Sequence, residues 1–113
     1  MHALIIEDEP LIAMAIEDVL RDAGYFSFDF AVDAEEAIAA TQRKCPDLIT
    51  SDVMLAAGNG IDAIEAICSE QPLPVVFITG NASDVVARLP GFVIVPKPFS
   101  TADVLAAVQL AVR

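Results

Sequence analysis

The feature that most constrains the fold is an alternation, repeated five times, between a short apolar run and a helical segment. The apolar runs are rich in β-branched or aromatic residues and cover residues 3–6, 25–32, 48–52, 75–79 and 92–95. Runs of this kind predict strands, whereas apolar residues at helical spacing predict amphipathic helices. Strands that alternate with helices form a parallel sheet with right-handed crossovers and helices on both faces. The chain is therefore predicted to be a single α/β domain with a doubly wound parallel sheet.

Helix-terminating and helix-capping residues support this division of the chain. The expected helices cover about residues 11–23, 34–44, 61–71, 82–89 and 101–112. Pro10 suits a first helical turn, and Gly24 suits the position just past a helix end. Asp33 is expected to cap the second helix with Glu36 as its capping-box partner, and Ser100 is expected to cap the last.

Three further expectations concern side-chain placement. The alternating residues Phe26, Phe28 and Phe30 are expected to form part of the core on one face of an edge strand. His2 is expected to be an exposed residue at the chain terminus. The last helix is expected to pack on the sheet through one set of residues and to present an apolar outer stripe to a partner protein. The inner set is Val104, Leu105, Val108 and Val112, and the outer set is Ala106, Ala107 and Leu110.

The composition limits the classes of partner. The chain has 6 Lys and Arg against 17 Asp and Glu, a formal net charge of −11, so direct binding to nucleic acid is not expected. No apolar run has the length of a membrane helix, and no signal peptide precedes the first strand, so neither a membrane location nor secretion is expected. Cys45 and Cys68 lack a Cys-x-x-Cys spacing and are expected to be reduced thiols in a cytoplasmic protein.

Charged and hydroxyl side chains follow four of the predicted strands where each strand ends. In a parallel sheet, strand ends of one polarity meet at one edge, and ligands bind there. The residues brought to this edge are Glu7, Asp8, Glu9, Asp52, Thr79 and Lys97. Asp52 ends a buried apolar strand, where an acid is costly unless its charge is used. Glu9 is expected to face solvent at the start of the first helix.

These residue types favour phosphoryl chemistry with a divalent cation. Two carboxylates about 5 Å apart repel by about 3 kcal/mol at an effective dielectric constant near 20, so such a cluster takes up protons or a cation. Oxygen ligands without a nearby histidine favour a hard ion such as Mg²⁺. Lys97 and Thr79 would complete a site for an anion with several oxygens, and a carboxylate such as Asp52 can form an acyl phosphate.

The same residues resemble the signature of two-component response-regulator receiver domains. The resemblance rests on Glu7-Asp8, Asp52, Thr79-Gly80 and Lys97-Pro98-Phe99 in the family's order, and it covers residues 1–113 as one receiver domain. It implies a flavodoxin-like (βα)5 fold with strand order 2-1-3-4-5. It also implies a signalling protein rather than an enzyme, which catalyses only its own phosphorylation and dephosphorylation. Its expected partners are a histidine kinase or histidine phosphotransfer protein and a downstream protein.

The resemblance assigns roles to individual residues. Asp52 would accept the phosphoryl group, and Mg²⁺ (or Mn²⁺) would be held by Glu7, Asp8, Asp52 and the backbone carbonyl of Met54. Lys97 would contact the phosphoryl group, the Lys97–Pro98 bond would be cis, and Thr79 would be the switch hydroxyl. Met54 and Asn81 would line the mouth of the site, where they either tune dephosphorylation or serve only as loop residues.

Two departures from the family pattern concern signal transmission. The position three residues before Lys97 is often aromatic in receivers but is Ile94 here, so an aromatic rotamer switch is not expected. The stretch from Thr79 to Lys97 is short for the family, so the fourth helix is expected to be stubby or irregular. The combination of Phe77-Ile78-Thr79-Gly80, the non-aromatic Ile94 and the Gly58-x-Gly60 loop is similar to a subgroup of stand-alone receivers that work with HWE-type histidine kinases in stress signalling.

Other functions compete for the same residues. A phosphatase of the haloacid-dehalogenase type would carry Asp-x-Asp on the first strand, whereas the lone Asp here lies on the third. A flavodoxin would need a phosphate-binding loop after the first strand, where Glu7-Asp8-Glu9 would repel phosphate. A pseudo-receiver that only binds partners is the remaining alternative, and the complete set of acids, Thr79 and Lys97 argues against it. No effector domain is recognised, so output by protein contact is expected unless the chain is a fragment of a longer regulator.

Overall fold

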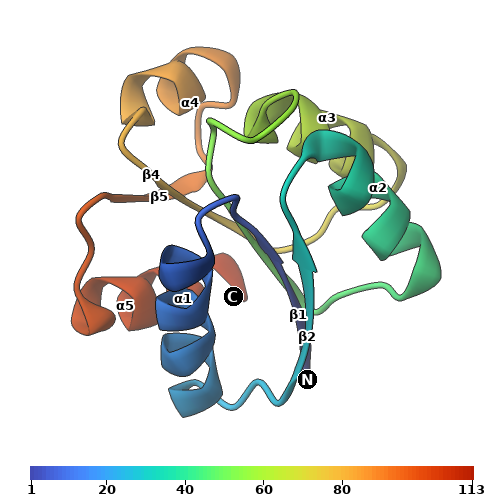
Figure 1. The fold of residues 1–113 in the computed structure, drawn as a ribbon. Coiled ribbons are helices and arrows are strands. Elements are labelled where there is room, and N and C mark those ends of the chain that lie inside the picture. The colour runs from blue at the N-terminus through green and yellow to red at the C-terminus, as the bar shows by residue number, and fades with distance from the viewer.

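Five strands alternate with five helices in the computed structural model, which describes residues 1–113 (Figure 1). The strands are β1 (His2–Ile6), β2 (Ser27–Ala31), β3 (Leu48–Ser51), β4 (Val75–Thr79) and β5 (Val93–Pro96). The helices are α1 (Pro10–Asp22), α2 (Ala34–Arg43), α3 (Gly60–Glu70), α4 (Ala82–Arg88) and α5 (Thr101–Ala111). All ten predicted elements are present. The largest difference is in β2, because Tyr25 and Phe26 lie in the connection between α1 and β2 rather than in the strand.

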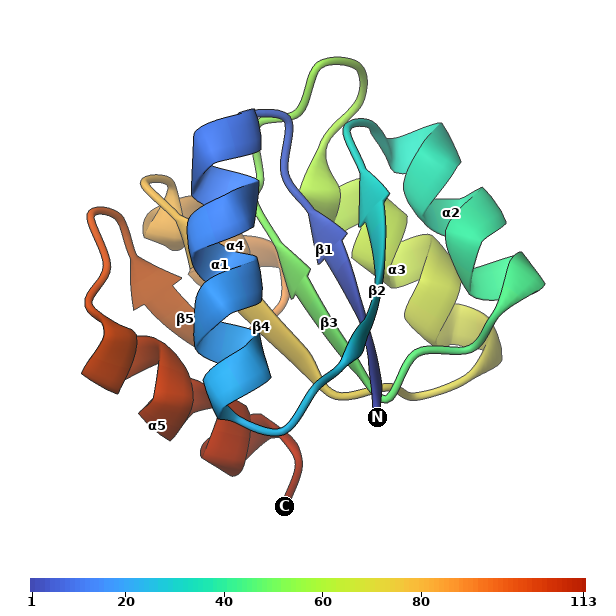
Figure 2. The same cartoon turned by 60° about the horizontal axis from the view of Figure 1, so that its bottom comes forward.

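The strands form one parallel sheet in the order β2-β1-β3-β4-β5, which confirms the predicted flavodoxin-like arrangement. Helices α1 and α5 cover one face, and α2, α3 and α4 cover the other (Figures 1 and 2). The chain begins at β1 and forms the edge strand β2 on one side of it. The next strand, β3, lies on the other side of β1, so β1 and β3 are neighbours. The carboxyl ends of these two central strands therefore lie side by side.

The sheet separates two apolar clusters of similar size. Ala3 and Ile5 of β1 point toward α1 and α5, whereas Leu4 and Ile6 point toward α2 and α3. All four are at most 1% exposed. Because both faces are covered, β1 has no polar side and its sequence shows no alternation. Full burial of each large aliphatic side chain contributes about 2 kcal/mol, which makes the central strands the most strongly held part of the fold.

Side-chain caps define the start of three helices. Asp33 Oδ1 accepts a hydrogen bond from the Glu36 amide at 2.8 Å, and Glu36 Oε1 accepts one from the Val32 amide at 3.0 Å. Ser100 caps α5 as predicted, with its Oγ 3.1 Å from the Asp103 amide. Asn59 caps α3 through the Asp62 amide at 2.9 Å, although the sequence indicated only a flexible loop there. Each cap satisfies a backbone donor that the helix cannot satisfy itself.

The prediction that the phenylalanine stripe belongs to the core is wrong for two of its members. Phe28 packs against the core and lies under the Arg21 guanidinium, 4.9 Å from its ring centre. Phe26 is 73% exposed and Phe30 48% exposed. Phe26 precedes the edge strand β2, and the ring of Phe30 lines an open hollow beside Met14 of α1, so the core encloses neither ring.

The prediction of an exposed His2 is also wrong. His2 is the first residue of β1 and is 6% exposed. Its Nδ1 lies 2.8 Å from Ser27 Oγ and its Nε2 lies 3.0 Å from Asp29 Oδ2, both on the neighbouring strand β2. A buried imidazole needs such partners, and only the register of β1 against β2 supplies them.

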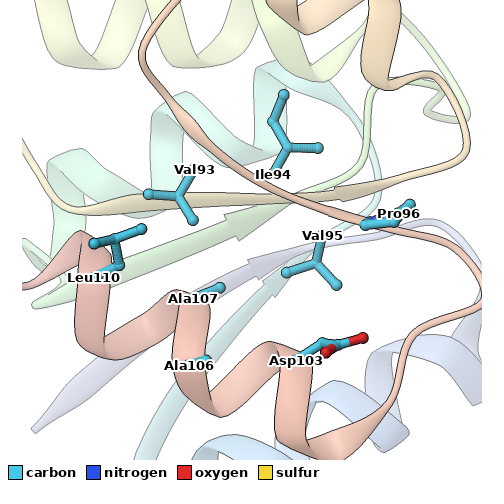
Figure 3. A pocket seen from close by; sticks show the side chains of 8 residues that line it. All are labelled: Val93, Ile94, Val95, Pro96, Asp103, Ala106, Ala107 and Leu110. Carbon is cyan, nitrogen blue, oxygen red and sulfur yellow. The ribbon is translucent and has the colours of Figure 1, made fainter.

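The orientation of α5 differs in part from the predicted one. Val104 and Val108 face the sheet as expected, but the third buried residue is Ala107, and Val112 is 46% exposed. Ala107 belongs to the same apolar cluster as Val95 of β5. Beside it, Val93, Val95, Ala106 and Leu110 line a hollow along the outer edge of the sheet (Figure 3). None of the five helices combines the length and the apolar character that a membrane crossing requires.

A buried hydroxyl in β3 offers a test of this packing. Thr50 is 1% exposed, and its Oγ1 has no hydrogen-bond partner. Replacement by valine removes an unsatisfied polar group at nearly constant shape, so we expect Thr50→Val to raise the free energy of unfolding by about 1 kcal/mol.

Urea-induced unfolding followed by circular dichroism measures this change. Thr41→Val is the matched control, because the Thr41 hydroxyl does donate a hydrogen bond, to the Ile38 carbonyl at 2.8 Å. The control is expected to leave stability unchanged or lower it. A Thr50→Val protein that is less stable than wild type would contradict the buried, unsatisfied placement.

Candidate functional site

The predicted site residues gather at the edge of the sheet formed by the carboxyl ends of the parallel strands (Figure 2). Glu7 and Asp8 follow β1, Asp52 follows β3, Thr79 ends β4 and Lys97 follows β5. These elements are far apart in the sequence, and the sheet order alone brings them together. Glu9 lies outside the cluster as expected, because it is the exposed N-cap residue of α1.

Three carboxylates form the centre of the site. One oxygen from each of Glu7, Asp8 and Asp52 lies within 4.8 Å of the other two. Glu7 is 4% exposed and Asp52 8%, whereas Asp8 is more accessible to solvent. The amide of Glu7 donates to the Ala31 carbonyl at 2.9 Å, and the amide of Asp52 donates to the Ile6 carbonyl at 3.0 Å. Extension of the sheet's hydrogen bonding past the strand ends therefore fixes both buried acids.

Lys97 links the two buried acids. Its Nζ donates to Glu7 Oε1 at 2.8 Å and to Asp52 Oδ2 at 2.7 Å. The Lys97 amide donates to the Thr79 carbonyl at 3.0 Å, and the Lys97–Pro98 peptide bond is cis. The lysine thus supplies the positive charge that two buried carboxylates require.

The environment shifts the pKa of two of these groups. Burial raises the pKa of Glu7 above its ordinary value, and the hydrogen bond from Lys97 opposes this effect only in part. Burial lowers the pKa of Lys97, but its hydrogen bonds to Asp52 and Glu7 outweigh that effect, so the pKa of Lys97 lies above its ordinary value. The lysine is therefore held in its charged form.

Both oxygens of the Asp52 carboxylate have partners on the protein. Oδ2 accepts from Lys97, and Oδ1 accepts from the Val53 amide at 2.6 Å. Hydrogen bonds to an ionised carboxylate are stronger than those between neutral groups. The carboxylate at the tip of β3 is thus held in one orientation.

Thr79 lies next to the site on β4. It is fully buried, and its Oγ1 accepts a hydrogen bond from the Asn81 amide at 3.0 Å. Ile94 on β5 points to the opposite side of its strand from Val95, toward the cluster that α4 covers (Figure 3). Helix α4 has only seven residues and is the shortest in the fold, in agreement with the expected short segment.

Gly60 is a further residue that shapes the site, although the sequence indicated only a flexible loop there. A Cβ atom at this position would lie 1.8 Å from the Asp52 carbonyl oxygen and 2.5 Å from Ser51 Oγ. The Gly60 amide also donates to the Val53 carbonyl at 2.8 Å, which closes the loop that carries Met54. The glycine is needed for close approach of α3 to the backbone of Asp52. A glycine directly after a capping Asn was a usable indication of a helix start.

Met54 and Asn81 are the two residues expected at the mouth of the site. Met54 is 62% exposed, and Asn81 is partly exposed. Both follow a strand-end residue of the site by two positions. Their predicted places at the mouth of the site are compatible with this exposure, and their chemical roles stay predictions.

The donor set fits a hard divalent cation. All three grouped ligands are carboxylates, and neither a histidine nor a cysteine belongs to the group. Oxygen-only sites of this kind suit Mg²⁺, which commonly uses one or two carboxylates together with water. Glu7, Asp8 and Asp52 therefore form a candidate metal centre.

Comparison with known proteins places these features in context. The family model described as "Response regulator receiver domain" matches residues 3–109. The chain is 37% identical to the transcriptional regulatory protein PdtaR of Mycobacterium tuberculosis, over 98% of this chain and 56% of that protein. It is 38% identical to the phyllosphere-induced regulator PhyR of Methylorubrum extorquens, over 96% of this chain and 42% of that protein. The chain thus spans about half the length of these relatives.

Solved structures show the same fold. The receiver domain of PhyR from Erythrobacter litoralis superposes with a TM-score of 0.90 at 35% identity, covering 97% of this chain and 88% of that one. The response regulator PhyR from Brucella abortus gives a TM-score of 0.88 at 34% identity, covering 98% of this chain and 47% of that one.

The close approach at Gly60 leads to a first test of the site. We expect Gly60→Ala to lower the free energy of unfolding by about 3 kcal/mol or more, because the new methyl group would overlap the Asp52 carbonyl. Gly80→Ala is the matched control, since a Cβ there meets nothing within 4 Å. Urea unfolding of both variants measures the difference, and equal stabilities would contradict the contact.

The raised pKa of Glu7 predicts a pH-dependent stability difference in the absence of divalent cations. A folded-state pKa above the unfolded value of 4.5 means that the folded protein binds a proton more readily than the unfolded chain does. The ionised carboxylate therefore costs stability, and this cost is removed as the pH falls through the raised pKa toward 4.5.

Glu7→Gln mimics the protonated form at every pH. We expect this variant to be more stable than wild type at neutral pH and the difference to narrow as the pH falls toward 4.5. Urea unfolding at several pH values with a chelator present measures the difference. A difference that stays constant across this range would contradict the burial of Glu7.

Proposed function

This chain belongs to the response regulator receiver domain family, and we propose that Asp52 is its phosphoryl acceptor in a two-component or phosphorelay pathway. The observation that carries the proposal is the ion pair of 2.7 Å between Lys97 Nζ and Asp52 Oδ2 beside Glu7 and Asp8. An acceptor carboxylate needs a nearby cation that can also contact the oxygens of the incoming phosphoryl group. We assign residues 1–113 to one receiver domain.

The proposed reaction uses the Asp52 carboxylate as nucleophile. The donor is a phosphohistidine on a histidine kinase or a histidine phosphotransfer protein. One carboxylate oxygen forms the new bond to phosphorus, the phosphorus–nitrogen bond breaks, and its electron pair stays on the donor's histidine. The product is an acyl phosphate on Asp52. Later attack of water on the phosphorus returns the carboxylate and inorganic phosphate.

Lys97 would supply charge neutralisation during this transfer. In the structure its ammonium lies between Asp52 and Glu7, at 2.7 and 2.8 Å. Its side chain is 21% exposed, so it borders the opening of the site. A phosphoryl group on Asp52 brings oxygens that compete for the same ammonium, and the lysine can contact them without leaving the site.

Mg²⁺ (or Mn²⁺) fits the three acids, and the backbone carbonyl of Met54 is the proposed fourth protein ligand. The cation, when bound, would offset the negative charge of the acids and of the phosphoryl oxygens. Glu7 and Asp8 would hold it against Asp52. Burial of Glu7 at the end of β1 fixes one side of this cradle before any ligand binds.

Thr79 and Ile94 lie on the route by which phosphorylation of Asp52 would be transmitted to an output surface. Thr79 is the proposed switch hydroxyl, because it ends the strand beside Asp52 and its backbone carbonyl already binds the Lys97 amide. The side chain of Ile94 cannot follow it as an aromatic ring would, so transmission would depend on the backbone of β4, β5 and α4. Met54 and Asn81 are the positions that would tune dephosphorylation.

The output we propose is contact with a downstream protein. Structures of related chains are described as the anti-anti-sigma factor PhyR of Bartonella quintana and the PhyR stress response regulator. Together with the sequence features of the subgroup, they support a stress-signalling role with an HWE-type kinase. A pseudo-receiver that is never phosphorylated is the alternative that the next experiment separates.

We expect acetyl phosphate with Mg²⁺ to add a single phosphoryl mass to the protein. Intact-mass spectrometry measures the product, and removal of Mg²⁺ by a chelator is expected to abolish it. Asp52→Asn should show no added mass. Asp18→Asn, which changes an exposed acid on α1, is the matched control and should react as wild type does.

Two results would count against the proposal. An equal mass gain in Asp52→Asn would place the phosphoryl group elsewhere. The absence of any product in wild type, both with acetyl phosphate and with phosphorylated histidine kinases, would leave the pseudo-receiver function.

A further inference from the structure

Ser51 is a buried polar residue in an otherwise mostly apolar strand, and no step described above uses it. It is the last residue of β3 and is 1% exposed. Its hydroxyl donates a hydrogen bond to the backbone carbonyl of Asp52 at 2.8 Å. The side chain therefore binds the backbone of the proposed acceptor rather than its carboxylate.

The peptide group between Asp52 and Val53 is held at both of its polar atoms. Its carbonyl oxygen accepts from Ser51 Oγ, and its N–H donates to Asp52 Oδ1 at 2.6 Å. Because a peptide group is planar, fixing the direction of the carbonyl oxygen also fixes the direction of the N–H. The Ser51 hydroxyl thus determines where the amide that binds Oδ1 points.

Gly60 confines this arrangement from the other side. A Cβ atom there would lie 2.5 Å from Ser51 Oγ and 1.8 Å from the Asp52 carbonyl oxygen. The serine hydroxyl and the carbonyl oxygen therefore share the narrow space that the glycine leaves at the start of α3. Within this space the hydroxyl is positioned to remain on the Asp52 carbonyl.

We infer that Ser51 is a positioning residue for phosphoryl transfer to Asp52. The inference rests on the proposed function of Asp52. With Oδ1 held by the Val53 amide and Oδ2 by Lys97, the plane of the carboxylate is defined by two contacts. Loss of the Ser51 hydrogen bond frees the peptide group, and with it one of these two contacts. Small losses of alignment at a nucleophile slow a transfer reaction considerably.

Two variants separate the hydrogen bond from the packing. Ser51→Ala removes the donor and leaves a small space, whereas Ser51→Cys keeps that space filled, with a somewhat larger atom that is only a weak donor. We expect both to be phosphorylated by acetyl phosphate and Mg²⁺ about tenfold more slowly than wild type, the factor expected for a lost buried hydrogen bond. Ser69→Ala is the matched control, because the Ser69 hydroxyl also donates to a nearby backbone carbonyl at 2.8 Å, but on the exposed side of α3.

A second measurement reports the contact itself. The amide proton of Val53 is expected to move upfield in the ¹H–¹⁵N correlation spectrum of both Ser51 variants, because its hydrogen bond to Oδ1 weakens. Ser69→Ala should leave this resonance and the phosphorylation rate unchanged. Unfolding by urea shows whether each variant is folded under the conditions of the assay.

The outcomes distinguish the inference from the proposed function. If wild type reacts and both Ser51 variants react equally fast, the inference fails alone. It also fails if only Ser51→Ala is slow, since the space rather than the donor would then matter, or if the Val53 resonance does not move. If Ser51→Ala does not fold, Ser51→Cys decides. If wild type reacts neither with acetyl phosphate nor with phosphorylated histidine kinases, both the proposed function and the inference fail.

Discussion

The contact between Lys97 and the two buried acids is the interaction on which the rest of the site depends. Glu7 and Asp52 lie on neighbouring strands, and their charges would repel across a poorly solvated gap without a cation between them. Lys97 follows the edge strand β5, which β4 separates from β3, and its ammonium still reaches both carboxylates. The parallel order of the strands is therefore a requirement of the site as well as of the core. A topology that placed β5 elsewhere would leave two buried acids without a partner.

Backbone geometry does as much as side-chain chemistry to define this site. The amide of Asp52 is bound to β1, its carbonyl oxygen is bound to Ser51, and its carboxylate is bound to Val53 and Lys97. Gly60 brings the start of α3 against the same carbonyl. The candidate nucleophile is thus fixed by three different elements of the fold. Such fixation is the structural form that preorganisation takes in sites that stabilise charge.

The fold and the main site could be predicted because both follow from local patterns. Apolar periodicity located all ten elements, and parallel topology then required Glu7, Asp52, Thr79 and Lys97 to share one edge. The features that could not be predicted depend on contacts across the sheet. The burial of His2 requires the register of β1 against β2, and the exposure of Phe26 and Phe30 depends on how completely the rest of the chain covers the edge strand β2 and the segment before it. The part that Gly60 plays depends on a distance of closest approach, which no spacing in the sequence encodes.

The two prolines around Lys97 have a consequence for conformational entropy. Each fixes its own φ angle, and Pro98 also restricts the backbone of the lysine before it. The segment that carries the ammonium therefore has few conformations to lose when the chain folds, which reduces the entropic cost of forming the buried ion pairs. What freedom remains lies in the four side-chain torsions of the lysine. A stiff backbone with a mobile tip suits a lysine that contacts two fixed acids and, under the proposed function, the oxygens of a phosphoryl group as well.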